Sequence, residues 1–167
     1  MRARKIIREK ELYHTVIKGS ILQEYIRILN VYAPNYRLSK YVMQKQIELQ
    51  GKKIDESTII VSDFDRPLSV IDRSTRQKIS KDIVELNSTI NQLDIIDIYG
   101  IFHPTTAEYT FFSSSYGTFM KIDHIMGHKM HLNTFKLVEI IQSMLSNQKG
   151  NKLVIKNRTI TRKFQII

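Results

Sequence analysis

The sequence has no cysteine and no long hydrophobic run, and each absence excludes a class of protein. Without cysteine there is no disulfide framework, no thiolate zinc site and no cysteine nucleophile. No stretch approaches the ~18 apolar residues of a membrane-spanning helix, and the basic N-terminal segment lacks the apolar core of a signal peptide. We therefore expect a soluble intracellular protein, nuclear or cytoplasmic, without a membrane partner.

Acidic residues are also scarce, because 26 Lys and Arg stand against 16 Asp and Glu and give a net charge of +10. This excess favours a polyanionic partner, although membrane-surface proteins and simply soluble basic domains share it. After Glu139 every charged residue is basic. The basic C-terminal tail, residues 157–167, is either solvated and frayed or in contact with phosphates. The sequence does not indicate an oligomeric state.

The length of 167 residues suits one domain, which we assign to residues 1–156. Apolar β-rich runs over 12–18 and 25–32, with Gly19 and Ser20 between them, predict a hairpin. Residues 38–49 have helical spacing, and 58–61 read as a short buried strand.

The clearest helix covers residues 79–93, where apolar residues recur three or four positions apart, and Ser74 or Thr75 is its expected N-cap. Further strands are expected over residues 95–99, 109–112, 122–125, 137–141 and 153–155. Strands interleaved with two helices predict a mixed α/β sandwich with helices outside the sheets.

Three carboxylates could carry chemistry. Asp63 and Asp65 follow the buried strand, and Asp123 lies between apolar residues in the segment KIDHI. Carboxylates gathered at strand ends can hold Mg²⁺ and orient a water for attack on a phosphodiester. Each also has a local explanation, as a turn residue, its solvated neighbour or a partner of a core amide.

The neighbouring histidine and aromatic residues are weaker candidates. His124 alternates with Asp123 along a strand and should face the opposite side of the sheet, so it is no obvious base for that carboxylate. Tyr109, Phe111 and Phe112 could stack on nucleic-acid bases, but we favour a place in an alternating strand core.

Four segments together resemble one family: NVYAPN from Asn30, SDFDRPLSVIDRSTRQK from Ser62, IIDIYGIFHPTTAEYTFFSS from Ile95 and KIDHIMG from Lys121. They resemble the endonuclease domain of mammalian long-interspersed-element retrotransposons, within the exonuclease-endonuclease-phosphatase superfamily. The resemblance implies a four-layer α/β sandwich, Mg²⁺-dependent nicking of DNA and use of the nicked end to prime reverse transcription. In this family an earlier segment supplies an Asn and the metal-anchoring Glu, so we expect a partial sandwich that lacks the N-terminal strands.

Two further departures affect the chemistry. The family's GDFN reads Ser62 to Asp65 here, so that Asp63 matches the water-aligning carboxylate but Asp65 replaces an Asn. The family's closing Ser-Asp-His aligns with Ser146, Asn147 and Gln148. The resemblance makes that His the catalytic base held by the carboxylate matched by Asp123, and a Gln has no titratable nitrogen.

Several binding positions of the family survive. Tyr32 matches the tyrosine at the scissile phosphate, Thr110 a threonine near the target nucleotide, and Arg73 a basic residue that faces the DNA backbone. Residues 113–120 correspond to a hairpin that reaches into the minor groove, and Ser113 and Ser146 are further expected DNA contacts.

The sequence thus predicts a degenerate, catalytically inactive endonuclease domain in which Mg²⁺ is not productively bound. The catalytic positions Tyr32, Asp63, Asp65 and Asp123 are then vestigial. Three alternatives stay open: a non-catalytic DNA-binding remnant with weak, largely sequence-independent affinity, a residually active nuclease, and a reading frame that folds marginally.

Overall fold

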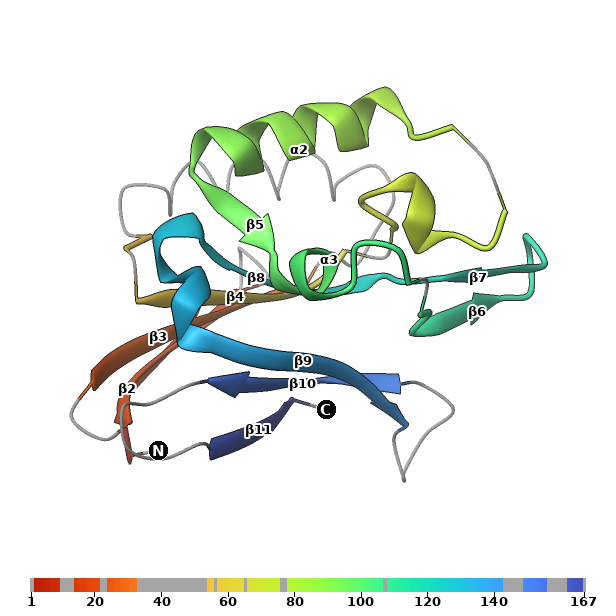
Figure 1. Cartoon of the computed structure of the whole chain (residues 1–167). Coiled ribbons are helices and arrows are strands. Elements are labelled where there is room, and N and C mark those ends of the chain that lie inside the picture. The colour runs from red at the N-terminus through yellow and green to blue at the C-terminus, as the bar shows by residue number, and fades with distance from the viewer. Residues whose placement is uncertain are drawn as a thin grey trace.

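The computed structural model describes residues 2–9, 14–21, 24–32, 54–55, 57–64, 66–75, 78–106, 108–142, 149–155 and 162–166. These residues form two main sheets, a small hairpin and a helical layer (Figure 1). No helix in this part of the chain is long and apolar enough to cross a membrane.

The larger sheet has six strands. In chain order they are β1 (Arg2–Glu9), β2 (His14–Ile21), β3 (Glu24–Tyr32), β4 (Thr58–Asp63), β5 (Ile95–Asp97) and β8 (Asp123–His128). The spatial order is β1-β2-β3-β4-β8-β5. Only the pair β3 and β4 is parallel among these strands. The end of β4 and the beginning of β8 therefore meet at one edge of the sheet.

The smaller sheet contains β9 (Phe135–Gln142), β10 (Lys149–Ile155) and β11 (Arg162–Ile166), in the order β11-β10-β9. It packs against one face of the six-stranded sheet. The separate hairpin of β6 (Phe111–Ser113) and β7 (Thr118–Met120) extends to one side (Figure 1).

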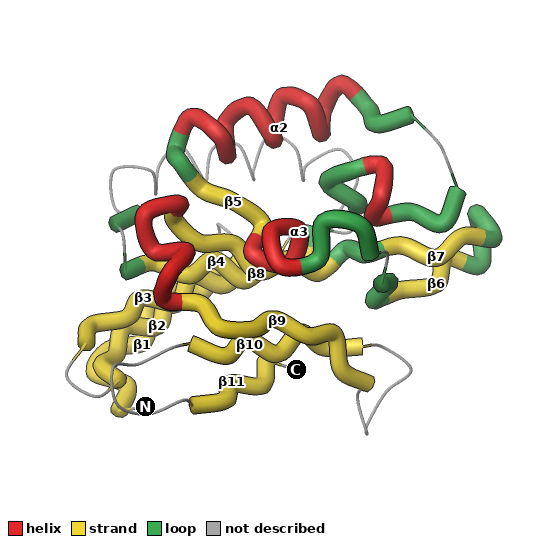
Figure 2. Tube along the Cα trace, viewed as in Figure 1, coloured by secondary structure: helices red, strands yellow, loops and turns green. Residues whose placement is uncertain are grey.

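One long helix covers the other face of the six-stranded sheet. Figure 2 shows α2 (Lys81–Gln92) above this sheet and the three-stranded sheet below it. The short helices are α3 (Ile98–Phe102), η2 (Val70–Asp72) and η3 (Lys129–Thr134). Of these, α3 and η3 contact β9, and Ile98 of α3 belongs to the core between the two sheets. The described residues thus form helix, sheet and sheet layers of an α/β sandwich.

Two apolar cores fill the spaces between these layers. Under α2, its buried Ile83, Leu86 and Ile90 pack on strand residues such as Met126. Between the sheets, Ile125 packs with residues that include Val138 and Leu153. Because side chains alternate along a strand, consecutive residues of β8 belong to different cores.

Gly127 of β8 lies close to side chains of β9 and α3. A Cβ atom built on this glycine would stand 2.8 Å from Cζ of Phe135 and 3.2 Å from Cδ1 of Ile98. Real Cβ atoms do not come so close to another heavy atom, so only glycine fits here without movement of its neighbours.

Several sequence-based expectations are confirmed in outline and wrong in detail. The hairpin forms, but Gly19 and Ser20 lie within β2, which continues to Ile21, and they pair with Ile26 and Tyr25 of β3. The strand β1 was not expected from the basic N-terminal sequence. Pairing with β2 satisfies its backbone groups, whatever the charge of its side chains.

The helix over 79–93 is confirmed, but its N-cap is Ser80, and neither Ser74 nor Thr75 caps it. Both hydroxyl groups instead lie within hydrogen-bonding distance of Thr118 Oγ1, at 3.0 and 3.2 Å. The strand expected over 95–99 ends at Asp97, because the Asp97 side chain caps α3.

Two expectations fall at least partly beyond the described ranges. The helix over 38–49 lies wholly outside them. Of the tail assigned to 157–167, the described part, Arg162–Ile166, is strand β11 and pairs with β10. The boundary itself stays a prediction.

Candidate functional site

Asp63 and Asp123 meet at one edge of the six-stranded sheet. Asp63 is the last residue of β4, Asp123 is the first of β8, and the two are register partners. Directly opposed residues of an antiparallel pair lie on the same face, with Cβ atoms about 5 Å apart. Their position in the register places both on the face that packs against the smaller sheet. The structure therefore brings together two of the three carboxylates that the sequence singled out.

Neighbouring polar groups hold Asp123 in place. The Thr110 hydroxyl hydrogen-bonds to the Asp123 carboxyl group and also accepts the backbone N–H of Ile122 at 3.1 Å. Asn151 of β10 donates its side-chain amide to the backbone carbonyl of Asp123 at 3.2 Å. Thr110 is only 3% exposed. Its visible role is to support Asp123, and its contact with DNA stays a prediction.

The pKa of Asp123 is raised above its usual value. Burial is the largest cause, and the negative charge of Asp63 acts in the same direction. The Thr110 hydrogen bond and His124 act in the opposite direction without cancelling the effect. Because the charge of Asp63 disfavours ionisation of Asp123, a cation bound between the two side chains would favour the ionised form of Asp123.

The other expected catalytic positions are less well defined. Tyr32 pairs through its backbone with Asp63, which places the two residues side by side at the sheet edge, but the Tyr32 side chain is not described. Asp65, Ser146, Asn147 and Gln148 lie outside the described residues. Their roles stay predictions.

Asp63 and Asp123 have the oxygen chemistry that a magnesium ion requires. Mg²⁺ is usually held by one or two carboxylates together with water and substrate phosphates. Within the described ranges, however, no group of three or more His, Asp or Glu side chains could hold a metal ion. Among the described residues, Asp63 and Asp123 are thus the two carboxylates that would hold Mg²⁺, and water and substrate phosphates would supply its other ligands.

His124 lies on the opposite face of β8 from Asp123, as the alternation predicts. Its Nδ1 atom is 3.0 Å from Oδ2 of Asp97, and its ring stacks on Phe64 with centroids 5.7 Å apart. The ring is fully buried under the helical layer. His124 therefore cannot act on a group that Asp123 faces.

Asp97 belongs to a buried charge cluster that sequence reasoning missed. The Lys121 ammonium lies 2.8 Å from Asp97 Oδ2 and 3.2 Å from Asp72 Oδ1. Asp97 also accepts the backbone N–H of Tyr99, and Asp72 accepts that of Ser69. The only local signal for this cluster was the position of Asp97 directly before α3, which is typical of an N-cap residue. Nothing local indicated its distant partners.

The charge cluster controls the ionisation of Asp97. Burial alone would raise the pKa of its carboxyl group. The hydrogen bond and charge of His124, and then the charge and hydrogen bond of Lys121, outweigh burial and hold this pKa well below the usual range. Asp97 is therefore an ionised, fully engaged structural carboxylate.

A basic groove lies beside the β6–β7 hairpin. This groove has a volume of about 490 Å³, and its lining includes Arg66, Arg73, Lys78 and Ser113. Arg73 forms an isolated bridge with Met120, which joins its loop to β7. Ser113 is buried in the wall of the groove. The structure thus places Arg73 and Ser113 in the lining of one groove and adds Arg66 and Lys78, and contact of Arg73 and Ser113 with DNA stays a prediction.

The hairpin carries three exposed aromatic side chains, Phe112, Tyr116 and Phe119. The ring centroids of Phe112 and Phe119 lie 4.7 Å apart. The expectation that Phe112 belongs to a strand core is wrong, because the hairpin is too short to be covered on both faces and this side chain is half exposed. A basic groove with aromatic rings at its border can contact both the phosphates and the bases of a nucleic acid.

Comparison with known proteins gives a consistent fold. No family model matches the chain. An AP endonuclease from Archaeoglobus fulgidus superposes with a TM-score of 0.64 at 17% identity, over 80% of this chain and 62% of that one. The 3′ phosphatase NExo from Neisseria, in a structure bound to a product DNA hairpin, gives 0.66 at 17% identity, over 84% and 64%. The chain thus spans less than two thirds of the length of either protein.

A third similar structure is the endonuclease domain of TRAS1, a telomere-specific non-LTR retrotransposon. Its TM-score is 0.66 at 12% identity, over 92% of this chain and 69% of that domain. At these identities the likeness establishes the fold, and the expected α/β sandwich is confirmed.

Proposed function

Since the chain has the α/β fold shared by AP endonucleases and the TRAS1 endonuclease domain, we propose that it is a degenerate retrotransposon-type endonuclease domain that binds DNA without cutting it. The observation that carries the proposal is the setting of Asp123. Its carboxyl group is held by Thr110, whereas the adjacent imidazole of His124 faces the other side of the sheet and bonds Asp97.

The missing element is a base. Hydrolysis of a phosphodiester needs a group that takes a proton from the attacking water, and a positioned base contributes ~10² to 10⁴-fold in rate. By resemblance to the retrotransposon family, this group would stand at position 148. Gln148 cannot accept a proton at neutral pH, so Asp123 has no imidazole to orient there.

The metal chemistry is weakened as well. Asp63 and Asp123 would hold Mg²⁺, which when bound would offset their mutual repulsion and polarise a phosphate oxygen. Asp65, at the position of an Asn in the family, adds a negative charge where a substrate phosphate would approach. We propose that Mg²⁺ is not held productively for hydrolysis.

The groove beside the hairpin supports retained binding. Contacts to phosphates need only cations and hydrogen-bond donors, which Arg66, Arg73 and Lys78 supply independently of the carboxylate pair. The net charge of +10 strengthens attraction to any polyanion. We therefore expect weak, largely sequence-independent affinity for DNA.

A plasmid assay tests both parts of the proposal. The full chain is incubated with supercoiled plasmid and Mg²⁺, with Asp63→Ala as the matched control, and its binding to a fluorescent duplex is measured by anisotropy. We expect saturable binding and no nicking above the control. Nicking that Asp63→Ala abolishes would instead establish a residually active nuclease, the second candidate, which the intact grouping of Asp63, Asp123 and Thr110 favours.

Absence of saturable binding at 50 mM salt would contradict the binding part of the proposal. The anisotropy measurement is therefore made at low salt first, with a circular dichroism melt of the same sample. A cooperative melt without binding would separate loss of function from marginal folding.

A further inference from the structure

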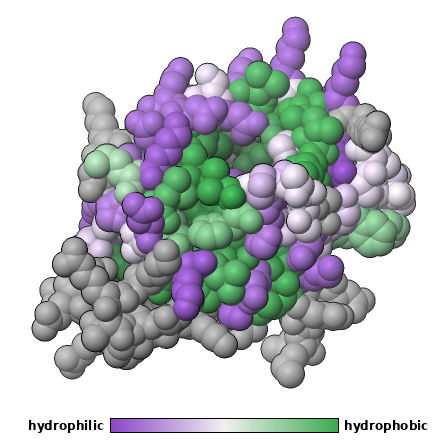
Figure 3. Space-filling view, viewed as in Figure 1, coloured by the Kyte–Doolittle hydropathy of each residue, from purple (hydrophilic) through white to green (hydrophobic). Residues whose placement is uncertain are grey.

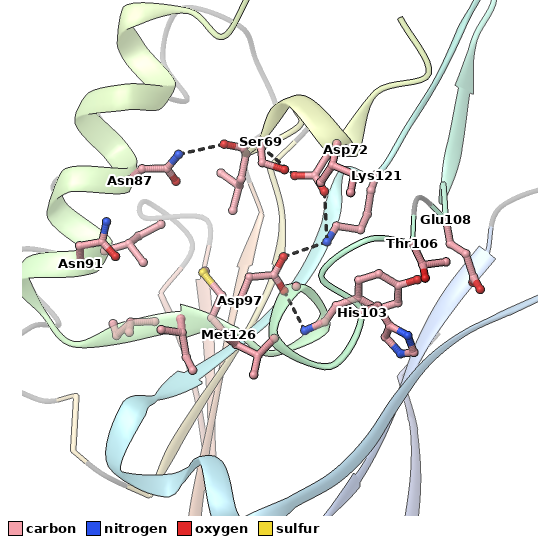
Figure 4. Close-up of a pocket in the computed structure, with 18 residues that line it drawn as sticks. Ser69, Asp72, Asn87, Asn91, Asp97, His103, Thr106, Glu108, Lys121 and Met126 are labelled. Carbon is pink, nitrogen blue, oxygen red and sulfur yellow. Dashed lines mark hydrogen bonds and ion pairs between the residues drawn. The ribbon is translucent and has the colours of Figure 1, made fainter. Parts of the chain in front are cut away.

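A second cavity lies between α2, η2 and α3 (Figure 4). Its volume is about 340 Å³, near the lower limit of small-molecule sites. Ile95 and Met126, which line it, belong to the core beneath α2. The cavity extends past β5, the border strand of this sheet, to Tyr99, which packs in the core between the two sheets.

The walls of the cavity are largely apolar. Leu68, Ile90, Ile95 and Met126 form the buried part. Ile71 of η2 and Ile101 of α3 border it and are exposed to solvent. Figure 3, which has the same view as Figure 1, shows apolar side chains that gather in a hollow below α2. These walls suit the body of a small apolar group.

The charges that line the cavity are unbalanced. Three carboxylates, Asp72, Asp97 and Glu108, stand against one ammonium, that of Lys121. The ion pairs to Asp72 and Asp97 already engage Lys121. Glu108, in contrast, is exposed. Figure 4 shows the paired groups inside the cavity and Glu108 at its border. The cavity therefore carries a surplus of two negative charges in a protein of net charge +10.

Tyr99 supplies a polar group that lacks a partner. The residue is only 4% exposed and lines the cavity, and its hydroxyl has no hydrogen-bond partner among the described residues. Burial, together with the charges of Glu108, Asp97 and Asp72, raises its pKa to about 12, so the phenol stays neutral. A buried hydroxyl without a partner is costly, which is why such groups usually meet a protein atom, a water or a ligand.

We propose that this cavity binds a small organic cation, a primary ammonium group carried on a single apolar ring. The ammonium donates hydrogen bonds to the Tyr99 hydroxyl oxygen and the Glu108 carboxylate, and the ring packs against Ile95, Met126 and the exposed Ile101. The site is independent of the proposed DNA-binding function.

The charge of the ligand follows from what Lys121 already does. An anion would need a free cation in the cavity, but the Lys121 ammonium is shared by two carboxylates and also lies 4.5 Å from the centre of the Tyr99 ring. A neutral ligand would gain the apolar contacts and leave the surplus negative charge unused. A cation uses both the walls and the charge.

The test uses three probes of one shape: 2-phenylethylammonium, neutral 2-phenylethanol and anionic 3-phenylpropionate. Binding to the full chain is followed by NMR of isotope-labelled Ile and Met methyl groups. We expect the ammonium to bind with a Kd on the order of 1 mM and to shift the methyl signals of Ile95, Ile101 and Met126. The alcohol should bind at least threefold more weakly, and the carboxylate should not shift these signals.

Two variants and a control test the named contacts. Glu108→Gln and Tyr99→Phe should each weaken ammonium binding by roughly three- to tenfold, because Tyr99→Phe removes the accepting hydroxyl and Glu108→Gln replaces a charged acceptor with a neutral amide oxygen. Glu108→Gln changes an exposed side chain, so it should fold even where Tyr99→Phe does not. Asp94→Asn removes a charge outside the cavity, at a residue with φ of 53° that Asn tolerates. It should leave the Kd unchanged.

Equal binding of ammonium and alcohol would overturn the proposal. So would shifts of methyl signals away from the cavity, no shift at 10 mM ammonium, or an unchanged Kd in Glu108→Gln.

Discussion

At the scale of single residues, Lys121 joins three segments of the chain. Its backbone N–H donates to the carbonyl of Asp72 at 2.8 Å, and its ammonium contacts both Asp72 and Asp97. It is 3% exposed, so water contributes little to its solvation. The contact with Asp72 fixes the loop of Arg73, and Asp123 follows two residues later. Lys121 therefore connects the basic groove to the carboxylate edge.

Substitution of Lys121→Met should reduce the free energy of unfolding by about 3 to 5 kcal/mol, because it removes the cation that pairs with the buried carboxylate of Asp72 and with the half-buried one of Asp97. Urea unfolding measures the change. Lys129→Met is the matched control, since Lys129 forms an exposed pair with Asp94 at 3.3 Å and should cost less than about 1 kcal/mol. Equal effects of the two substitutions would contradict the structural role of the cluster.

The low pKa of Asp97 predicts a dependence of stability on pH. Because the folded-state pKa lies below the unfolded value of 3.8, the carboxylate contributes stability that is fully present well above pH 3.8. That contribution is lost as the pH falls below 3.8 towards the folded-state pKa. The difference in free energy of unfolding between the natural chain and Asp97→Asn should therefore be largest near pH 6 and shrink at pH 3. A difference that grows on acidification would contradict this assignment.

At the scale of elements, the β6–β7 hairpin combines firm attachment with exposed rings. The backbone N–H of Ser74 donates to the carbonyl of Phe119 at 3.0 Å, and Thr118 is buried against Ser74 and Thr75. The turn contains Tyr116 and then Gly117, whose φ of 56° favours glycine. The hairpin can thus present its rings without being part of a core.

Tyr116→Ala should weaken DNA binding at least about fivefold with almost no change in stability, because Tyr116 is 71% exposed and a stacked base contributes ~1 kcal/mol or more. Fluorescence anisotropy with a short duplex and with a single strand checks the change. Met130→Ala is the control, since Met130 is 69% exposed on η3. A loss of affinity in the control alone, or in neither variant, would place the interface elsewhere.

The elements differ in how far the sequence could predict them. Local patterns predicted α2, β4 and the β2–β3 hairpin, because the spacing of apolar residues within each short segment indicates the type of element and its buried face. Local patterns singled out Asp63 and Asp123 separately, but their pairing depends on the register of two strands about 60 positions apart and was not predicted. The cluster of Asp72, Asp97 and Lys121 could not be predicted, since three separate segments meet there only after the sheet has formed.

At the scale of the whole molecule, charge and layering act together. The net charge of +10 favours association with a polyanion in any orientation, whereas the groove beside the hairpin selects one face. Lys129 lies just beyond the far end of β8 from Asp123, so it can serve as a cation remote from the carboxylate edge.

Salt should weaken DNA binding measurably. If Arg66, Arg73 and Lys78 each contact one phosphate, the logarithm of affinity falls with a slope of about −2.7 against the logarithm of salt concentration, roughly a 40-fold loss between 50 and 200 mM. Lys78→Ala should reduce this slope by about 0.9, and Lys129→Ala should leave it unchanged. A flat response to salt would contradict an electrostatic interface.

The identity of the residue at position 127 limits how closely the two sheets can pack. Gly127→Ala would push its new methyl group into the Phe135 ring, which then has to yield or drive the sheets apart. Any such widening would lengthen the hydrogen bond from the Asn151 side-chain amide to the backbone carbonyl of Asp123. The absence of one methyl group at position 127 thus sets the separation of the two sheets. A homologue with a larger residue there would need a compensating change on the facing side, at Phe135, to keep Asp123 and its neighbours aligned.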